Sequence, residues 1–104
     1  MITATTANIP GKEVSELLGI SRGSTVRARN IGRDIFAGLK NIVGGEISEY
    51  TRLQAQSREQ AFQRMMKDAE SMGADAVINV RFTTSMVMQG AAEMLAYGTA
   101  VKLK

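Results

Sequence analysis

The run from Glu46 to Met72 constrains the fold of this chain more than any other segment. It contains neither Gly nor Pro, and it is rich in good helix formers such as Gln, Arg, Glu, Ala and Met. Gly73 follows as a natural stop, because glycine readily adopts the left-handed conformation that ends many helices. A single helix of about residues 47–72 is therefore predicted, and it is long for a chain of 104 residues.

Short β-branched or alternating segments on both sides of this helix predict strands. They cover residues 2–6, 24–30, 74–85 and 92–103, while residues 12–19 fit either helix or strand and 34–42 fit a short helix. Alternation places Ala76, Ile78, Val80 and Phe82 on one face of their strand, and Leu95, Tyr97, Val101 and Leu103 on one face of the last. Gly98 predicts a bulge or a close backbone approach. These elements make an α+β protein.

The size and composition of the chain predict one domain, residues 1–104, that is completed by other subunits. Aromatic residues make up only 5% of the chain and Trp is absent, so the core is modest and aliphatic. One long helix covers one face of a sheet, yet strand 74–85 carries apolar or small residues on both faces. A second copy of the chain is the simplest cover for the remaining face, so we expect a homo-oligomer.

The long helix has a polar centre on its apolar side. On a helical wheel, Ile47, Tyr50, Ala61, Phe62, Met65, Ala69 and Met72 share a face whose middle holds Thr51, Gln54 and Arg58. A buried guanidinium needs a carboxylate, a bound anion or water, and the candidate carboxylates are Glu46 and Glu93. We therefore predict a polar cluster that either fixes subunit docking or binds a small anion.

The residue inventory argues against several kinds of chemistry. There is no His and no Cys, which removes zinc sites, most transition-metal sites and the common nucleophilic triads. Met86, Met88 and Met94 could suggest Cu(I), but alternating Met in a strand more often fills a core. No metal site and no cofactor is expected. The remaining acid–base groups form no recognisable motif, so the sequence favours a protein that is not an enzyme.

The charge distribution and the hydropathy of the chain indicate whether it binds nucleic acid, anions or membranes. Of the net charge of +3, a surplus lies between Arg22 and Lys40, where Asp34 is the one acid, but no nucleic-acid motif accompanies it. Gly44-Gly45 before the helix could bind an anion, although a tight turn is the simpler interpretation. No apolar run reaches the length of a membrane span and no signal peptide is evident, so a cytoplasmic location is expected, without nucleic acid or membrane.

Several runs together resemble the YbjQ-like family of uncharacterised bacterial proteins. They are Arg27-Ala28-Arg29-Asn30-Ile31-Gly32-Arg33-Asp34-Ile35, Gly44-Gly45-Glu46-Ile47, Tyr50-Thr51, Arg58, Ala61, Arg64-Met65, Gly73-Ala74-Asp75-Ala76-Val77 and Ala96-Tyr97-Gly98-Thr99-Ala100-Val101. The resemblance covers nearly the whole chain.

The resemblance implies a dodecin-subunit-like fold. This is a β-α-β-β unit, with one long helix on an antiparallel sheet, that assembles as a homopentameric ring. It also implies that residues 12–20 form a strand. The family is sometimes labelled as heavy-metal-binding, which the absence of His and Cys disfavours. We expect an oligomer with a structural or ligand-binding role; the alternatives are a carrier of a small anion or molecule and, third, a metal-binding protein.

Overall fold

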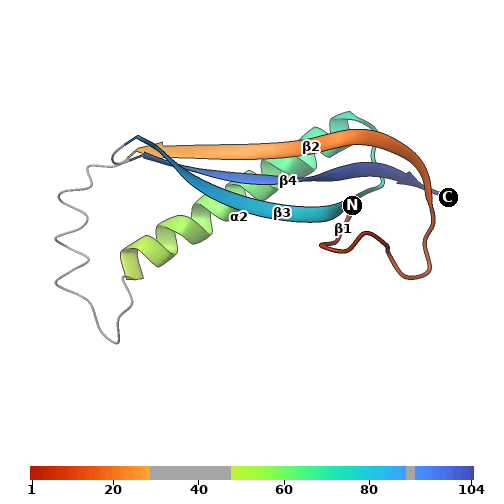
Figure 1. Cartoon of the computed structure of the whole chain (residues 1–104), viewed down its shortest axis with the longest axis horizontal. Helices are drawn as coiled ribbons and strands as arrows, with labels where there is room; N and C mark the ends of the chain where they lie inside the picture. Colours follow the sequence, from red (N-terminus) through yellow and green to blue (C-terminus); the bar gives the residue numbers. More distant parts are fainter. Residues whose placement is uncertain (29–47, 89–90) are drawn as a thin grey trace.

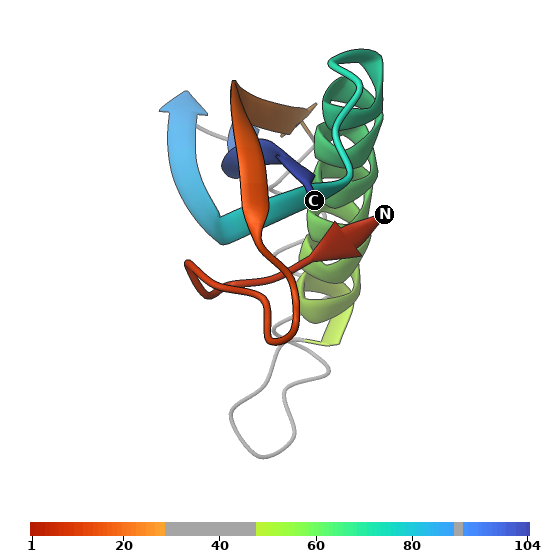
Figure 2. The ribbon, with the colours of Figure 1, turned by 90° about the vertical axis from the view of Figure 1, so that its right-hand side faces the viewer.

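A computed structural model describes residues 1–28, 48–88 and 91–104 of the chain. Its elements are β1 (Ile2–Thr3), β2 (Val14–Ala28), α2 (Ser48–Ser71), β3 (Ala76–Met88) and β4 (Ala91–Leu103). The sheet order is β1-β3-β4-β2, and the long helix lies on one side of the sheet (Figures 1 and 2). The predicted α+β class and the long helix are confirmed, and the strand implied for residues 12–20 is confirmed from Val14 onward.

The sheet is mixed rather than antiparallel throughout. β4 pairs antiparallel with both β2 and β3, as predicted, but β1 pairs parallel with β3 through Ile2–Ala76 and Thr3–Val77. Periodicity reports that a segment is a strand and gives no direction of pairing, so the sequence could not distinguish the two. The expected short helix at 34–42 and the Gly44-Gly45 turn lie outside the described residues.

Gly73 ends α2, as the sequence predicted. Its φ of 81° is left-handed, and the amide of Ala74 donates to the carbonyl oxygen of Ala69 at 3.1 Å. This bond satisfies a main-chain carbonyl oxygen of the last helical turn, and the chain then leads directly into β3.

Small residues allow α2 to lie very close to the edge strand β2. A Cβ at Gly23 would overlap the main chain of Ala61, Arg64 and Met65, so only glycine fits beneath the helix there. Two neighbouring hydroxyls reach the helix main chain: Ser21 donates to the carbonyl oxygen of Met65 and Thr25 to that of Ser57. The polar side of this part of β2 thus faces α2, and Val26 faces away.

The main core lies between α2 and the sheet. It is built from buried aliphatic side chains of the helix and of the strands beneath it: Ala61, Met65, Ala69, Val77, Val80, Met94, Ala96 and Ala100. A smaller cluster, Ala76, Ile78 and Val101, lies on the other face under Ile9 and Leu103. The segment between β1 and β2 therefore covers one end of the face opposite α2 (Figure 2).

A bulge at Asn79 corrects the predicted faces of β3. Asn79 has a φ of 53°, and the register with β4 shifts between Ile78 and Arg81. Ala76 and Ile78 therefore face away from α2, whereas Val80 and Phe82 face it. The predicted single face containing all four is wrong, because one extra residue reverses the alternation.

Gly98 on β4 makes the predicted close approach. A Cβ there would lie 2.6 Å from Cγ1 of Val77 and 2.9 Å from the carbonyl oxygen of Ile78. The grouping of Leu95, Tyr97, Val101 and Leu103 on one face agrees with the register, and this face is the one turned away from α2.

Candidate functional site

The helix follows the β2 edge of the sheet and leaves much of β3 uncovered. Asp68 and Arg64 of α2 bond to the main chain of Arg22 and Ser24 on β2, and the Arg27 guanidinium donates to Gln60 at 2.9 Å. On the other side of the helix, Phe62 reaches Phe82 of β3 with ring centroids 6.3 Å apart. Beyond this contact, the helix-facing side of β3 is exposed. It carries Met86, the most exposed large apolar residue among those described.

Thr51, Gln54 and Arg58 run along this β3 side of α2, one to three turns before Phe62. We call these three residues the polar stripe. All three are exposed in the single subunit, although the wheel placed them within the apolar face. The wheel gave their direction around the helix axis, but Thr51 and Gln54 precede Ser57, the first buried position among the described residues of α2, and Arg58 lies one residue after it, ahead of the fully buried Ala61. The stripe is therefore not buried within the described part of one subunit, and its predicted role at a subunit contact or in anion binding stays a prediction.

Glu93, one of the two candidate carboxylates of the predicted cluster, lies on the opposite side of the sheet. It pairs with Val26 on β2 and Ser85 on β3, whereas the next residue, Met94, pairs with Thr25 and packs in the core under α2. Side chains of successive strand residues point to opposite faces, so Glu93 points away from the helix. Glu46 lies outside the described residues. The structure thus brings Thr51, Gln54 and Arg58 together and separates Glu93 from them.

The face that carries Glu93 is open over most of its length, and we call it the open face. Its exposed or half-buried members on β2, β4 and β3 are Leu17, Ile20, Arg22, Ser24, Val26, Glu93, Leu95, Tyr97, Thr99, Arg81, Thr83 and Ser85. Three large apolar side chains on β2 are strongly exposed: Leu17 by 71%, Ile20 by 68% and Val26 by 57%. Strand alternation alone could not reveal this surface, because exposed and buried apolar residues give the same pattern.

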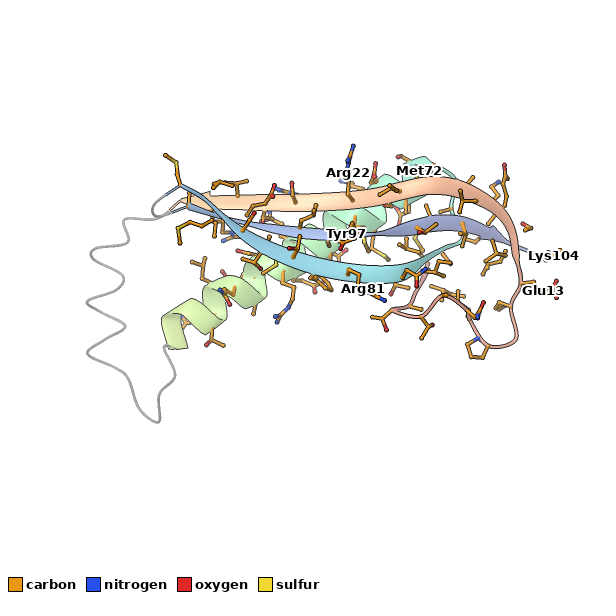
Figure 3. All side chains as sticks on the ribbon, viewed as in Figure 1. Glu13, Arg22, Met72, Arg81, Tyr97 and Lys104 are labelled. Atoms are coloured by element: carbon orange, nitrogen blue, oxygen red, sulfur yellow. The ribbon has the colours of Figure 1, made fainter. Side chains whose placement is uncertain are left out.

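A row of two arginines and one tyrosine crosses the open face. Tyr97 pairs with Arg22 on one side and Arg81 on the other. The two arginine side chains extend toward opposite edges of the sheet (Figure 3). Nη1 of Arg81 donates to the carbonyl oxygen of Thr5 at 2.7 Å. The two guanidinium groups therefore do not converge on a common ligand.

A shallow groove lies on the helix side of the sheet. It has a volume of about 180 Å³ and is lined by Thr3, Ala4, Thr5, Phe62, Val80 and Phe82. Its lining supplies hydroxyl and main-chain groups but no ionisable side chain. The groove could hold an apolar side chain more readily than a charged ligand, because it offers no charge to compensate one.

Metal ligands do not gather in the described part of the chain. No three His, Cys, Asp or Glu side chains lie close enough there to hold an ion. Of the three methionines, Met94 is in the core and accepts a hydrogen bond from Thr84, while Met86 and Met88 are exposed and lie on either side of a register shift in β3. No helix of the described residues is long and apolar enough to cross a membrane.

Comparison with known proteins decides the family. A family model described as "Putative heavy-metal-binding" matches residues 1–104. The chain belongs to the YbjQ-like family. It is 60% identical to a UPF0145 protein of Methanosarcina acetivorans, over 99% of this chain and 97% of that protein. It is 55% identical to a UPF0145 protein of Psychromonas ingrahamii, over 100% and 99% of the two chains. The family thus has archaeal as well as bacterial members.

A solved structure with a similar fold belongs to a protein of unknown function. This crystal structure, of a DUF74-family protein from Pediococcus pentosaceus, has a TM-score of 0.66 and 16% identity, and the match covers 100% of this chain and 98% of that one. At this level of identity the likeness shows a shared fold alone.

Proposed function

We propose that this YbjQ-like chain is the subunit of a homopentameric ring with a structural or ligand-binding role and no catalytic activity. The open face carries the proposal. Leu17, Ile20 and Val26 project from β2 on the side of the sheet that α2 does not cover. Exposed apolar surface of this kind usually marks an interaction site, because burying it releases ordered water.

The uncovered surfaces lie on two different sides of the subunit, which favours a ring. The open face is one, and the helix side of β3 with Phe82 and Met86 is the other. Two unlike surfaces that bind each other form a head-to-tail contact, and such contacts close into rings when the rotation between subunits permits. The number five comes from the family resemblance, since the angle between subunits cannot be read from one chain.

Native mass spectrometry of the untagged protein tests the assembly. We expect a pentamer for the wild type and smaller species for the double variant Ile20→Lys, Val26→Lys, which places two charges on the open face. The matched control is Gln63→Lys on the exposed side of α2, which should remain a pentamer. A monomeric wild type at micromolar concentration would refute the proposal.

A carrier of small anions is the second candidate, and the polar stripe favours it. Arg58 is exposed and makes no hydrogen bond or ion pair with the described residues. A guanidinium next to the amide of Gln54 suits a carboxylate or phosphate. This role predicts discrete extra mass on the native pentamer, and calorimetric binding of citrate or phosphate that Arg58→Gln abolishes. A ring of bare mass that releases no heat with either anion would exclude it.

A further inference from the structure

Arg58 and Glu93 are two opposite charges that the sheet keeps apart. Thr25 and Met94 form one cross-strand pair on the helix side, where the Thr25 hydroxyl donates to Ser57 of α2. Val26 and Glu93 form the next pair and therefore point to the other side. Arg58 follows Ser57 on the helix. The two side chains of one chain therefore lie on opposite sides of the sheet and cannot meet through it.

Neither charge has a partner among the described residues of its own subunit. The Glu93 carboxylate makes no hydrogen bond or ion pair with the described residues, although its side chain is half-buried between Val26, Ser85 and Leu95. Among the described residues, the basic side chains of the open face belong to the Tyr97 row, and they extend away from each other toward the sheet edges (Figure 3). Glu93 is thus an acid in a mainly apolar and hydroxyl-bearing part of the open face.

If another protein surface covered the open face, the unpaired carboxylate of Glu93 would lose water and destabilise that interface. A carboxylate that loses water without gaining a cation strongly destabilises an interface. The apolar side chains around it, Val26 and Leu95, favour a cover by protein rather than water. The cover must therefore bring a positive charge to Glu93.

The polar stripe of α2 has the properties such a cover needs. It offers a cation in Arg58 and an amide group in Gln54, with the small exposed side chain of Ala55 beside them. An arginine matches a carboxylate with two parallel hydrogen bonds and is only weakly hydrated, so it is well suited to a buried interface. The stripe is also exposed and turned toward the uncovered side of the helix.

We propose that Arg58 of one subunit binds Glu93 of the next, so that the first turns of α2 dock on the neighbouring open face. This inference rests on the proposed ring and names the pair that fixes its geometry. Each subunit gives one arginine and one glutamate to two different neighbours, which is the pattern a closed head-to-tail assembly requires.

A charge-swap experiment tests the pair. Arg58→Glu and Glu93→Arg are each expected to raise the protein concentration at which the native pentamer dissociates at least tenfold. The double variant carrying both changes is expected to restore the wild-type concentration, because the pair is re-formed in reverse. Lys67→Glu, an equal change of charge on the exposed side of α2, serves as the control and should leave the pentamer intact.

The outcomes separate this inference from the ring itself. If the wild type is a pentamer and both single variants dissociate no more readily than the control, the pair is refuted while the ring stands. Failure of the double variant to recover also refutes it, provided that its circular dichroism matches the wild type. Glu93→Gln, which keeps the shape of the side chain, guards against misfolding and should weaken the ring as well. A monomeric wild type removes both proposals together.

Discussion

The Ser21 hydroxyl donates a hydrogen bond to the main-chain carbonyl oxygen of Met65 over 2.6 Å, in a fully buried position. The partners are far apart in sequence, and the bond joins the edge strand directly to the helix main chain. Such contact requires the two backbones to approach closely, which Gly23 permits two residues later on the same face. The close attachment of α2 to β2 therefore depends on the small residues Ser21 and Gly23.

Gly23→Ala is expected to destabilise the fold by about 3 kcal/mol, since the added methyl would overlap helix backbone that cannot move aside easily. Chemical denaturation followed by circular dichroism measures the loss. Ser24→Ala is the matched control, because Ser24 faces the other way and its main-chain oxygen still accepts from Arg64. Equal midpoints for the two variants would show that the helix can shift away from β2.

Much of the fold follows from the sequence because two signals are strong. A run without Gly or Pro that ends at Gly73 predicts α2 to within a residue or two, and the alternation of β4 predicts its faces. The sequence does not predict which part of a helix or sheet face is covered by another element. The wheel placed Arg58 correctly around the helix axis, but which part of α2 lies over the sheet depends on how the helix crosses it. For the same reason, the local sequence pattern does not predict that the side chains of Ile20 and Val26 are exposed.

Asn79 is the second place where local pattern fails, and it carries its own prediction. Its φ of 53° suits asparagine or glycine but strains a β-branched residue. Asn79→Gly should leave the free energy of unfolding within about 0.5 kcal/mol of wild type. Asn79→Val should lower it by about 2 kcal/mol, because valine must either accept the strain or remove the bulge that turns Val80 toward the core. Urea denaturation of both variants compares them directly; equal stabilities would contradict a strained position.

The edge of β2 yields a prediction about main-chain protection. The amide of Arg22 donates to the Asp68 carboxylate at 3.1 Å, and Nη1 of Arg64 donates to the Ser24 carbonyl oxygen at 2.6 Å. Helix side chains thus bond to main-chain groups of an edge strand, which are otherwise open to pairing with other chains.

Asp68→Ala should therefore speed hydrogen exchange of the Arg22 amide at least tenfold, while the buried amide of Ala96 on the central strand keeps its wild-type rate. Exchange followed by nuclear magnetic resonance separates the two positions. Glu70→Ala, an exposed acid two residues further along α2, is the control. Unchanged exchange at Arg22 would mean that the carboxylate does not protect this edge.

The heavy-metal description of the family leads to the last prediction. Zinc and copper sites are built from imidazole, thiolate or clustered carboxylates, and this chain has no His and no Cys. Because a ligand that binds only the folded state raises the melting temperature, a specific metal would reveal itself in thermal unfolding. We expect the melting temperature in excess Zn²⁺, Cd²⁺ or Cu⁺ to stay within about 1 °C of the value in chelator, since a site occupied at a hundredfold its dissociation constant would add about 2.7 kcal/mol. Elemental analysis of protein purified without chelator should find less than one metal ion per ten chains. A stoichiometric metal that survives dialysis would show that this family binds ions through oxygen or thioether ligands alone.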